Sequence, residues 1–173
     1  MDHALQRQFL DHSIAKLRQY TDRIETCLAK LNQEQVWARG SENENAVGNL
    51  VLHLSGNVRQ WIISGVGNRV DVRERDREFS ARGGVTIAEL IERLRATVEE
   101  AAETIGAVTA ERLAETLVIQ NYAVSVMEAI YHVVEHFSMH TGQILFATKL
   151  LTGTDLGFYA HLRTTAAHGQ TTP

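Results

Sequence analysis

The chain has 173 residues, of which 44% are hydrophobic and 22% are charged, and this length is enough to bury the core of a single domain. Its formal net charge of −4 argues against nucleic-acid binding, which needs a basic surface. A single cysteine excludes an internal disulfide, and no run of about 18 apolar residues is present to cross a membrane. We therefore expect one cytoplasmic domain over residues 1–173, with a core at about 3–153 and a tail at 154–173.

Four stretches carry hydrophobic residues at helical spacing, and the only proline is Pro173, so the sequence favours an all-α fold. The first predicted helix covers about 2–31. A capped short turn at 32–35 and a polar loop follow it. The second predicted helix covers about 45–64, with Trp61 on its buried face.

Two longer connectors separate the remaining helices. The dense run of charges at 70–84 is interpreted as a solvated connection rather than a mobile lid. Capping-box patterns open a third helix over about 86–105 and a fourth over about 125–151, and the connector at 109–122 is expected to be extended for a few residues. Four amphipathic helices predict a four-helix bundle, with connectors longer than the simplest up-down-up-down arrangement needs.

Three of the eight histidines, His132, His136 and His140, are spaced four residues apart in the fourth predicted helix. A helix turns by about 100° per residue, so these side chains drift around it by about 40° per step. Measured from Phe137, at the centre of the buried stripe, His140 lies about 60° and His136 about 100° to one side. His132 lies about 140° away and is expected to face mostly solvent.

His53 occupies a matching position in the second predicted helix. It falls about 100° from Leu54, the centre of that buried face, and Asn57 lies on the same side at about 60°. Two packed helices can therefore bring His53 together with His136 and His140. A single histidine on such a flank is usually a satisfied polar residue, but a His-x₃-His pair with a third histidine on a matching flank predicts a metal site.

The spacing suits a divalent ion. Two imidazoles one turn apart reach an ion at about 2.0–2.1 Å, and a third from another helix completes a facial set. Coordination positions then remain for water or substrate, as in catalytic sites. Neutral imidazoles suit zinc or nickel first, with iron, copper or manganese as alternatives. We expect the open site to lie at a cleft beside Asn57 and Trp61.

Two segments resemble the signatures of the DinB-like (YfiT-like) metalloenzymes. The first is the segment 45–57, which contains His53. The second is the segment 135–144, where His-x₃-His is followed by Gly-Gln-Ile. The order and separation of the two segments agree with the family over about 9–151.

The resemblance implies a four-helix bundle, a metal held by His53, His136 and His140, and frequently a homodimer. Family activities include thiol-dependent S-transfer and a mycothiol-dependent maleylpyruvate isomerisation. The function expected is thus that of a metal-dependent enzyme, a thiol-dependent S-transferase or a related hydrolase. Its expected partners are a small-molecule substrate, such as a low-molecular-weight thiol, and a second copy of the chain, with no nucleic acid and no membrane.

Two other readings remain open. The run from His132 to His136 matches the H-x-x-E-H pattern of inverted zinc peptidases, in which Glu135 would be the general base. Glu135 lies about 160° from the core direction, which counts against this reading. The other alternative is a non-catalytic dimeric bundle that binds metal. For the dimer, Ala129, Ala147 and the tail around Phe158 are expected to offer exposed apolar surface.

Overall fold

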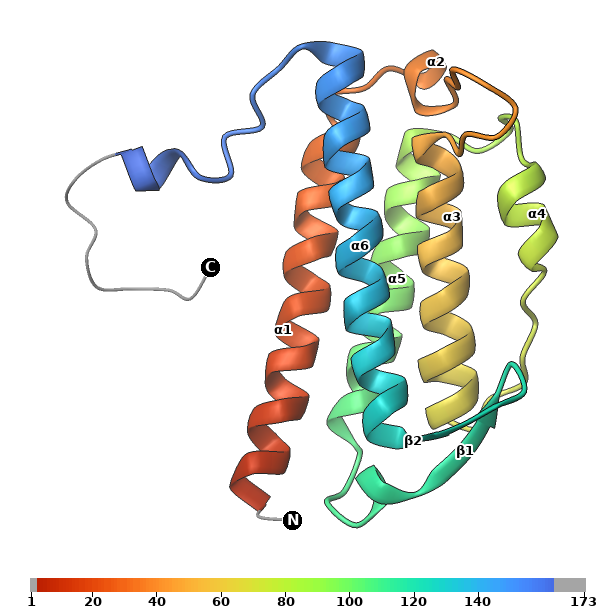
Figure 1. Cartoon of the computed structure of the whole chain (residues 1–173), viewed down its shortest axis with the longest axis vertical. Helices are drawn as coiled ribbons and strands as arrows, with labels where there is room; N and C mark the ends of the chain where they lie inside the picture. Colours follow the sequence, from red (N-terminus) through yellow and green to blue (C-terminus); the bar gives the residue numbers. More distant parts are fainter. Residues whose placement is uncertain (1–2, 164–173) are drawn as a thin grey trace.

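Long helices account for most of the computed structural model, which describes residues 3–163 (Figure 1). The elements in chain order are α1 (His3–Leu28), α2 (Gln33–Val36), α3 (Val47–Val58), the π-helix η1 (Arg59–Val66), α4 (Arg75–Ser80), α5 (Ile87–Gly106), the 3₁₀-helix η2 (Arg112–Ala114), β1 (Thr116–Ile119), β2 (Tyr122–Ser125), α6 (Val126–Thr152) and the 3₁₀-helix η3 (Ala160–Arg163). The prediction of a mainly helical chain is confirmed. The expected extended connector is an antiparallel hairpin, in which Thr116 pairs with Ser125 and Ile119 with Tyr122.

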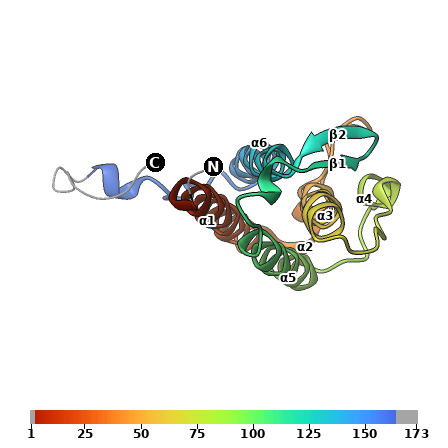
Figure 2. The same cartoon turned by 90° about the horizontal axis from the view of Figure 1, so that it is seen from below.

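The long helices pack side by side around a shared core. α1 contacts α5 and α6, and α3 contacts the same two helices from the other side (Figure 2). α1 and α6 run in one direction, whereas α3 and α5 run in the other (Figure 1). Because α3 and α5 are parallel, the chain must return along the length of α3 before α5 begins. Residues 67–86, which we call the strap, make this return and contain α4.

Buried apolar side chains from every long helix form one hydrophobic cluster. Its largest fully buried members are Phe137, Leu10, Leu17, Ile24, Leu28, Leu54, Ile62, Ile63, Leu90, Leu94, Ile105 and Ile130. Trp61, predicted to be core, is 4% exposed. No helix within residues 3–163 combines the length and the apolar character that crossing a membrane requires. The cluster fixes α3 and α6 side by side, which is what places their histidines.

Local hydrogen bonds set the ends of the helices. Glu128 N donates to Ser125 Oγ at 3.2 Å, and Ser125 N donates to the Glu128 carboxylate at 2.7 Å, so α6 begins with a complete capping box. α5 begins with the same box at Thr86 and Glu89. Gly153, with a left-handed φ of 63°, ends α6. The predicted starts of both helices and the stop of α6 are confirmed.

The expected exposed apolar surface is partly wrong. Ala129 is fully buried, because it faces the hydrophobic cluster rather than solvent. Ala147 and Phe158 are half-buried, and Phe158 lies under the Arg23 guanidinium, 5.4 Å from its ring centroid. The chain after α6 extends away from the helices (Figure 1). The last part of the predicted tail, residues 164–173, lies outside the described residues.

Candidate metal centre

Three imidazole nitrogens from two helices meet between α3 and α6. His53 Nε2 lies 3.1 Å from His136 Nε2, which in turn lies 3.2 Å from His140 Nε2. All three nitrogens lie within 4.8 Å of one another. An ion about 2.0–2.1 Å from each nitrogen, at tetrahedral or octahedral angles, would set neighbouring nitrogens about 2.9–3.4 Å apart. The structure therefore brings the three predicted residues together at a spacing that suits a shared ion.

The other ring nitrogen of His53 determines which tautomer it adopts. His53 Nδ1 lies 2.9 Å from Glu78 Oε2 and 3.1 Å from Arg73 Nη2. A lone pair on Nδ1 would face the negative carboxylate oxygen, whereas a proton there gives that oxygen a donor. Arg73 Nη2 donates to the same Glu78 oxygen at the shorter distance of 2.8 Å, so it has an acceptor without Nδ1. Nδ1–H donating to Glu78 is therefore favoured, which leaves a lone pair on Nε2 for a metal.

His140 is oriented in the same way from its own helix. Its Nδ1 lies 2.7 Å from Gln143 Oε1, so Nδ1–H donates to the amide oxygen and Nε2 again keeps its lone pair. The lone pairs of His53 and His140 thus point toward His136, which cannot donate a proton to both. A cation between the three nitrogens would relieve this conflict. His136 Nδ1 is buried and has no hydrogen-bond partner among the described residues.

A buried ion pair in the strap supports His53. Arg73 Nε donates to Glu78 Oε1 at 2.7 Å and Nη2 donates to Glu78 Oε2 at 2.8 Å, a bidentate pair. The Arg73 and Glu78 side chains are only 2% and 10% exposed. Gln60 accepts a third bond, from Arg73 Nη1, at 2.8 Å. The interpretation of 70–84 as a merely solvated connection is therefore wrong for these two residues, which no local sequence pattern marks.

Polar contacts from the start of α3 and from the loop before it hold the strap in place. Asn49, which is fully buried, donates from Nδ2 to the backbone oxygens of Glu78 and Ala81 at 2.8 and 3.0 Å. Arg39 Nη2 donates to the backbone oxygens of Phe79 and Ala81 at 3.3 and 3.0 Å. Asn49 therefore acts indirectly on the candidate metal centre, because it fixes the backbone that carries Glu78.

The surroundings of His136 and His140 favour the neutral imidazoles that a metal requires. Burial lowers the pKa of His136 to about 3, and the neighbouring His140 and His53 act in the same direction. Burial also lowers the pKa of His140, although its bond to Gln143 opposes this. Burial alone would raise the pKa of Glu78, but Arg73 and His53 outweigh it and hold that pKa below its usual range. Neutral imidazoles beside a charged carboxylate suit cation binding.

His132 departs from its predicted position. It is half-buried rather than turned to solvent, because its ring packs on Trp61 with centroids 4.1 Å apart. Its ring centroid lies 5.6 Å from that of His136, but its nitrogens are outside the group of three. Glu135 is exposed, as the helical wheel predicted. The described residues therefore do not place Glu135 in a site with the histidines.

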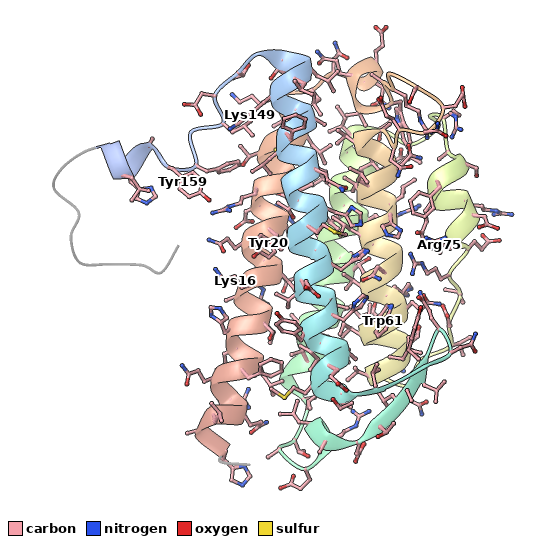
Figure 3. The ribbon with its side chains drawn as sticks, in the orientation of Figure 1. Lys16, Tyr20, Trp61, Arg75, Lys149 and Tyr159 are labelled. Carbon is pink, nitrogen blue, oxygen red and sulfur yellow. The ribbon has the colours of Figure 1, made fainter. Side chains whose placement is uncertain are left out.

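The predicted cleft is only partly present. A pocket of about 480 Å³ is lined by Trp61, His132, Glu128 and the hairpin residues Gln120, Tyr122, Ala123 and Val124. Asn57 does not line it and is 4% exposed. Figure 3 shows Trp61 beside α6, near the end of the α3–η1 helix. The pocket thus approaches the three histidines from the His132 side.

The π-helix η1 contacts both the Arg73–Glu78 ion pair and the His132 ring. Its wider turn is seen in the bond from Gly67 N to Ile62 O at 2.7 Å, five residues apart. η1 carries Gln60, which binds Arg73, and Trp61, which packs on His132. Segments of π-helix occur mostly as single turns, frequently at functional sites.

Gly56 provides a test of how closely the strap must approach α3. A Cβ at position 56 would overlap the Glu78 carboxylate, which can move aside only by giving up Arg73 or His53. We expect Gly56→Ala to weaken metal binding by about 10-fold or more, as loss of an orienting carboxylate does elsewhere. Competition with a chromogenic chelator measures this.

The matched control is Gly142→Ala in α6, where an added Cβ meets nothing within 4 Å. This change should leave the metal affinity unaltered and stabilise the helix by up to about 1 kcal/mol. Equal affinities for the two variants would show that the position of Glu78 does not matter for the ion.

Comparison with known proteins gives a family and a fold. The model of the family described as "Protein of unknown function (DUF1572)" matches residues 4–162. The structure is similar to the crystal structure of a conserved protein from Enterococcus faecalis, with a TM-score of 0.72 and 15% sequence identity. The match covers 83% of this chain and 97% of that chain, and at this identity it shows the fold alone. No curated protein matches the sequence.

Proposed function

The chain belongs to the family of proteins of unknown function DUF1572, and we propose that it is a metal-dependent enzyme with a DinB-like four-helix bundle. One divalent ion would be held by His53, His136 and His140, with zinc or nickel as the first candidates and iron, copper or manganese as alternatives. The resemblance of the segments 45–57 and 135–144 to the DinB-like signatures supports the proposal.

The observation that carries the proposal is the direction of the lone pairs. Glu78 and Gln143 each occupy the Nδ1 side of a histidine, so that Nε2 of His53 and Nε2 of His140 both face the same point beside His136. Such outer partners are typical of metal-ligating histidines. A satisfied polar cluster without a metal would instead pair each lone pair with a donor.

Three neutral ligands would leave a bound ion its charge and at least one open position, and a coordinated thiol or water would lose its proton more easily there. We therefore propose thiol-dependent S-transfer as the reaction class, with metal-dependent hydrolysis as the related alternative. The residues of the chain would orient the ligands and keep the imidazoles neutral. The pocket beside Trp61 and His132 offers space of about 480 Å³ for a substrate.

The first test is elemental analysis of protein purified without a metal-affinity step, followed by an assay on the same sample. We expect about one divalent ion per chain, and metal-dependent conjugation of a low-molecular-weight thiol to an electrophile that stops after chelation and returns with the ion. Stoichiometric metal without any thiol or hydrolase turnover would favour the non-catalytic bundle. Absence of metal under all loading conditions would contradict the proposal itself.

We also propose a cytoplasmic homodimer that uses the outer face of α6. Tyr131, Met139, Phe146 and Leu150 are 61%, 54%, 66% and 71% exposed along this helix, and large exposed apolar faces mark association surfaces. Light scattering should give twice the chain mass at micromolar concentration, and Phe146→Glu should shift it toward the monomer. A wild-type protein that stays monomeric would contradict the dimer.

A further inference from the structure

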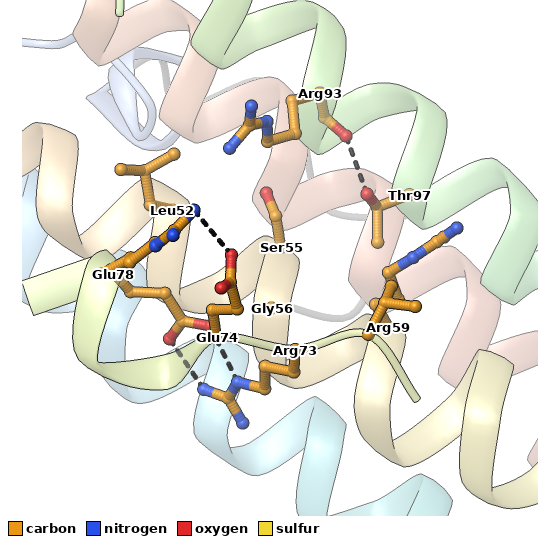
Figure 4. A pocket seen from close by; sticks show the side chains of 11 residues that line it. Leu52, Ser55, Gly56, Arg59, Arg73, Glu74, Glu78, Arg93 and Thr97 are labelled. Carbon is orange, nitrogen blue, oxygen red and sulfur yellow. Dashed lines mark hydrogen bonds and ion pairs between the residues drawn. The ribbon is translucent and has the colours of Figure 1, made fainter. Parts of the chain in front are cut away.

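A second pocket borders the strap's ion pair of Arg73 and Glu78, which also contacts His53. It has a volume of about 470 Å³ and is bounded by α3, the strap and α5. Figure 4 shows Arg93 and Thr97 of α5 facing Arg73, Glu74 and Glu78 of the strap, with Ser55 and Gly56 of α3 between them. None of the three histidines lines this pocket. It is therefore distinct from the proposed metal centre, although Arg73 and Glu78 border both.

The charge of the pocket is opposite to that of the protein. Its lining includes four arginines and two glutamates, an excess of two positive charges in a chain of formal net charge −4. The arginines are Arg59, Arg73, Arg77 and Arg93, and the glutamates are Glu74 and Glu78. A concave surface of one sign attracts small ions of the other sign.

The arginines differ in how firmly they are held. The Arg73 side chain is buried and forms an ion pair with Glu78. Arg59 and Arg77 form ion pairs at 2.9 Å with Glu100 and Glu74, but the side chains in both pairs are 40–79% exposed. Such pairs contribute about 0–1 kcal/mol and break easily in favour of a better partner.

Arg93 is the cation available to a ligand. Its guanidinium has no hydrogen-bond or ion-pair partner among residues 3–163, where only its backbone oxygen accepts a bond, from Thr97. Glu89, which feels its charge, is instead bound by the backbone and hydroxyl of Thr86 at 2.7 and 2.8 Å. Ser55 and Thr97 donate their hydroxyl protons to backbone oxygens, so the arginines supply the donors of this pocket.

We propose that this pocket binds a small organic anion through carboxylate or phosphate oxygens held by Arg93, with Arg59 and Arg77 as secondary contacts. A planar guanidinium matches both oxyanions with two parallel hydrogen bonds. The volume exceeds what one phosphate needs and lies in the range of sites for small organic molecules. Leu52 and Val72 provide apolar walls for the body of the ligand.

The site is coupled to the metal centre through the strap. A ligand that bridges α5 and the strap would fix Glu78 in the position from which it orients His53. Its negative charge would also offset the positive lining beside the ion. Both effects favour binding of the cation, and reciprocity requires the cation to favour the anion equally. This coupling rests on the proposed metal function, whereas anion binding does not.

The experiment is a calorimetric titration of chelator-treated protein with inorganic phosphate and, separately, with succinate, at constant ionic strength. Stronger binding of one of the two distinguishes a phosphate from a carboxylate ligand. We expect saturable binding that Arg93→Gln weakens at least about 10-fold, as expected for loss of a bidentate charged contact. Arg69→Gln is the matched control, because it removes the same charge from an exposed position outside the pocket, and it should change nothing.

The titrations are repeated on metal-loaded protein. We expect a bound anion to tighten metal binding about fivefold or more in the wild type and not in Arg93→Gln. No saturable binding of either anion, or equal binding by Arg93→Gln and Arg69→Gln, would overturn the site. Binding that requires metal and ignores Arg93 would place the anion on the ion instead and also overturn it. Anion binding by protein that never takes up metal would support the site while the metal function failed.

Discussion

Replacing His136 by alanine should reduce bound metal from about one ion per chain to background. Its Nε2 is the central nitrogen, 3.1 Å from that of His53 and 3.2 Å from that of His140, so its loss leaves an ion with two protein ligands instead of three. Structural zinc sites with four ligands bind with about 10–16 kcal/mol, or roughly 2.5–4 kcal/mol per ligand. We therefore expect affinity to fall at least about 100-fold. Elemental analysis and chelator competition measure this.

His132→Ala is the control from the same helix face. It removes a half-buried imidazole that packs on Trp61 but leaves the group of three intact. This variant should keep its ion, and the metal should still stabilise it by about 2.7 kcal/mol at a hundredfold excess over the dissociation constant. If His132→Ala loses the ion while His140→Ala keeps it, the inverted-peptidase assignment of ligands is correct instead.

The second large effect is expected at Glu78. Glu78→Gln removes the charge that holds His53 Nδ1 and leaves Arg73, which is 2% exposed, without an anionic partner. Removing one partner of a buried ion pair lowers the free energy of unfolding by about 3–5 kcal/mol. Loss of an orienting carboxylate weakens metal binding about 10–100-fold. Denaturant unfolding of metal-free protein gives the first quantity, and chelator competition gives the second.

The double variant Arg73→Met/Glu78→Gln separates the two effects. Removing both charges should restore much of the unfolding free energy, because no buried charge is left unpaired, whereas the metal affinity should stay low. Glu74→Gln, on the same strap, breaks only an exposed pair with Arg77 and should change stability by less than about 0.5 kcal/mol. A Glu78→Gln protein as stable as Glu74→Gln would show that the pair is not truly buried.

The histidine trio and the helix starts were predictable because their signals are local. The Thr86 and Ser125 capping boxes and the four-residue spacing of His136 and His140 depend only on helix geometry. His53 lies at the same angle from the buried face of its helix as His136 does from that of α6, and this was enough to predict it as the third ligand. The same reasoning placed His132 too far toward solvent, because a helical wheel does not include the Trp61 ring supplied by η1.

The Arg73–Glu78 pair could not be predicted in this way. In the sequence both residues belong to a run of alternating charges, and such runs are usually solvated. Only the parallel course of α3 and α5 forces this segment back along α3, where Asn49 binds its backbone and Gly56 leaves room for the carboxylate. The partners of Asn49 are 29 and 32 residues away, beyond the reach of any local pattern.

The long return of the strap also bears on when the centre can form during folding. His53 is separated in sequence from Glu78 by 25 residues and from His136 by 83. Bringing these three side chains together therefore closes two long loops, and only the docking of α3, the strap and α6 can offset the entropy that this costs. Only His136 and His140 are close in sequence, so the unfolded chain offers an ion at most this pair of ligands, and the set of three forms only after His53 has docked. Contacts made after the folding barrier change the unfolding rate rather than the folding rate. A bound ion should therefore slow unfolding, and so lengthen the lifetime of the folded protein, while the folding rate stays the same.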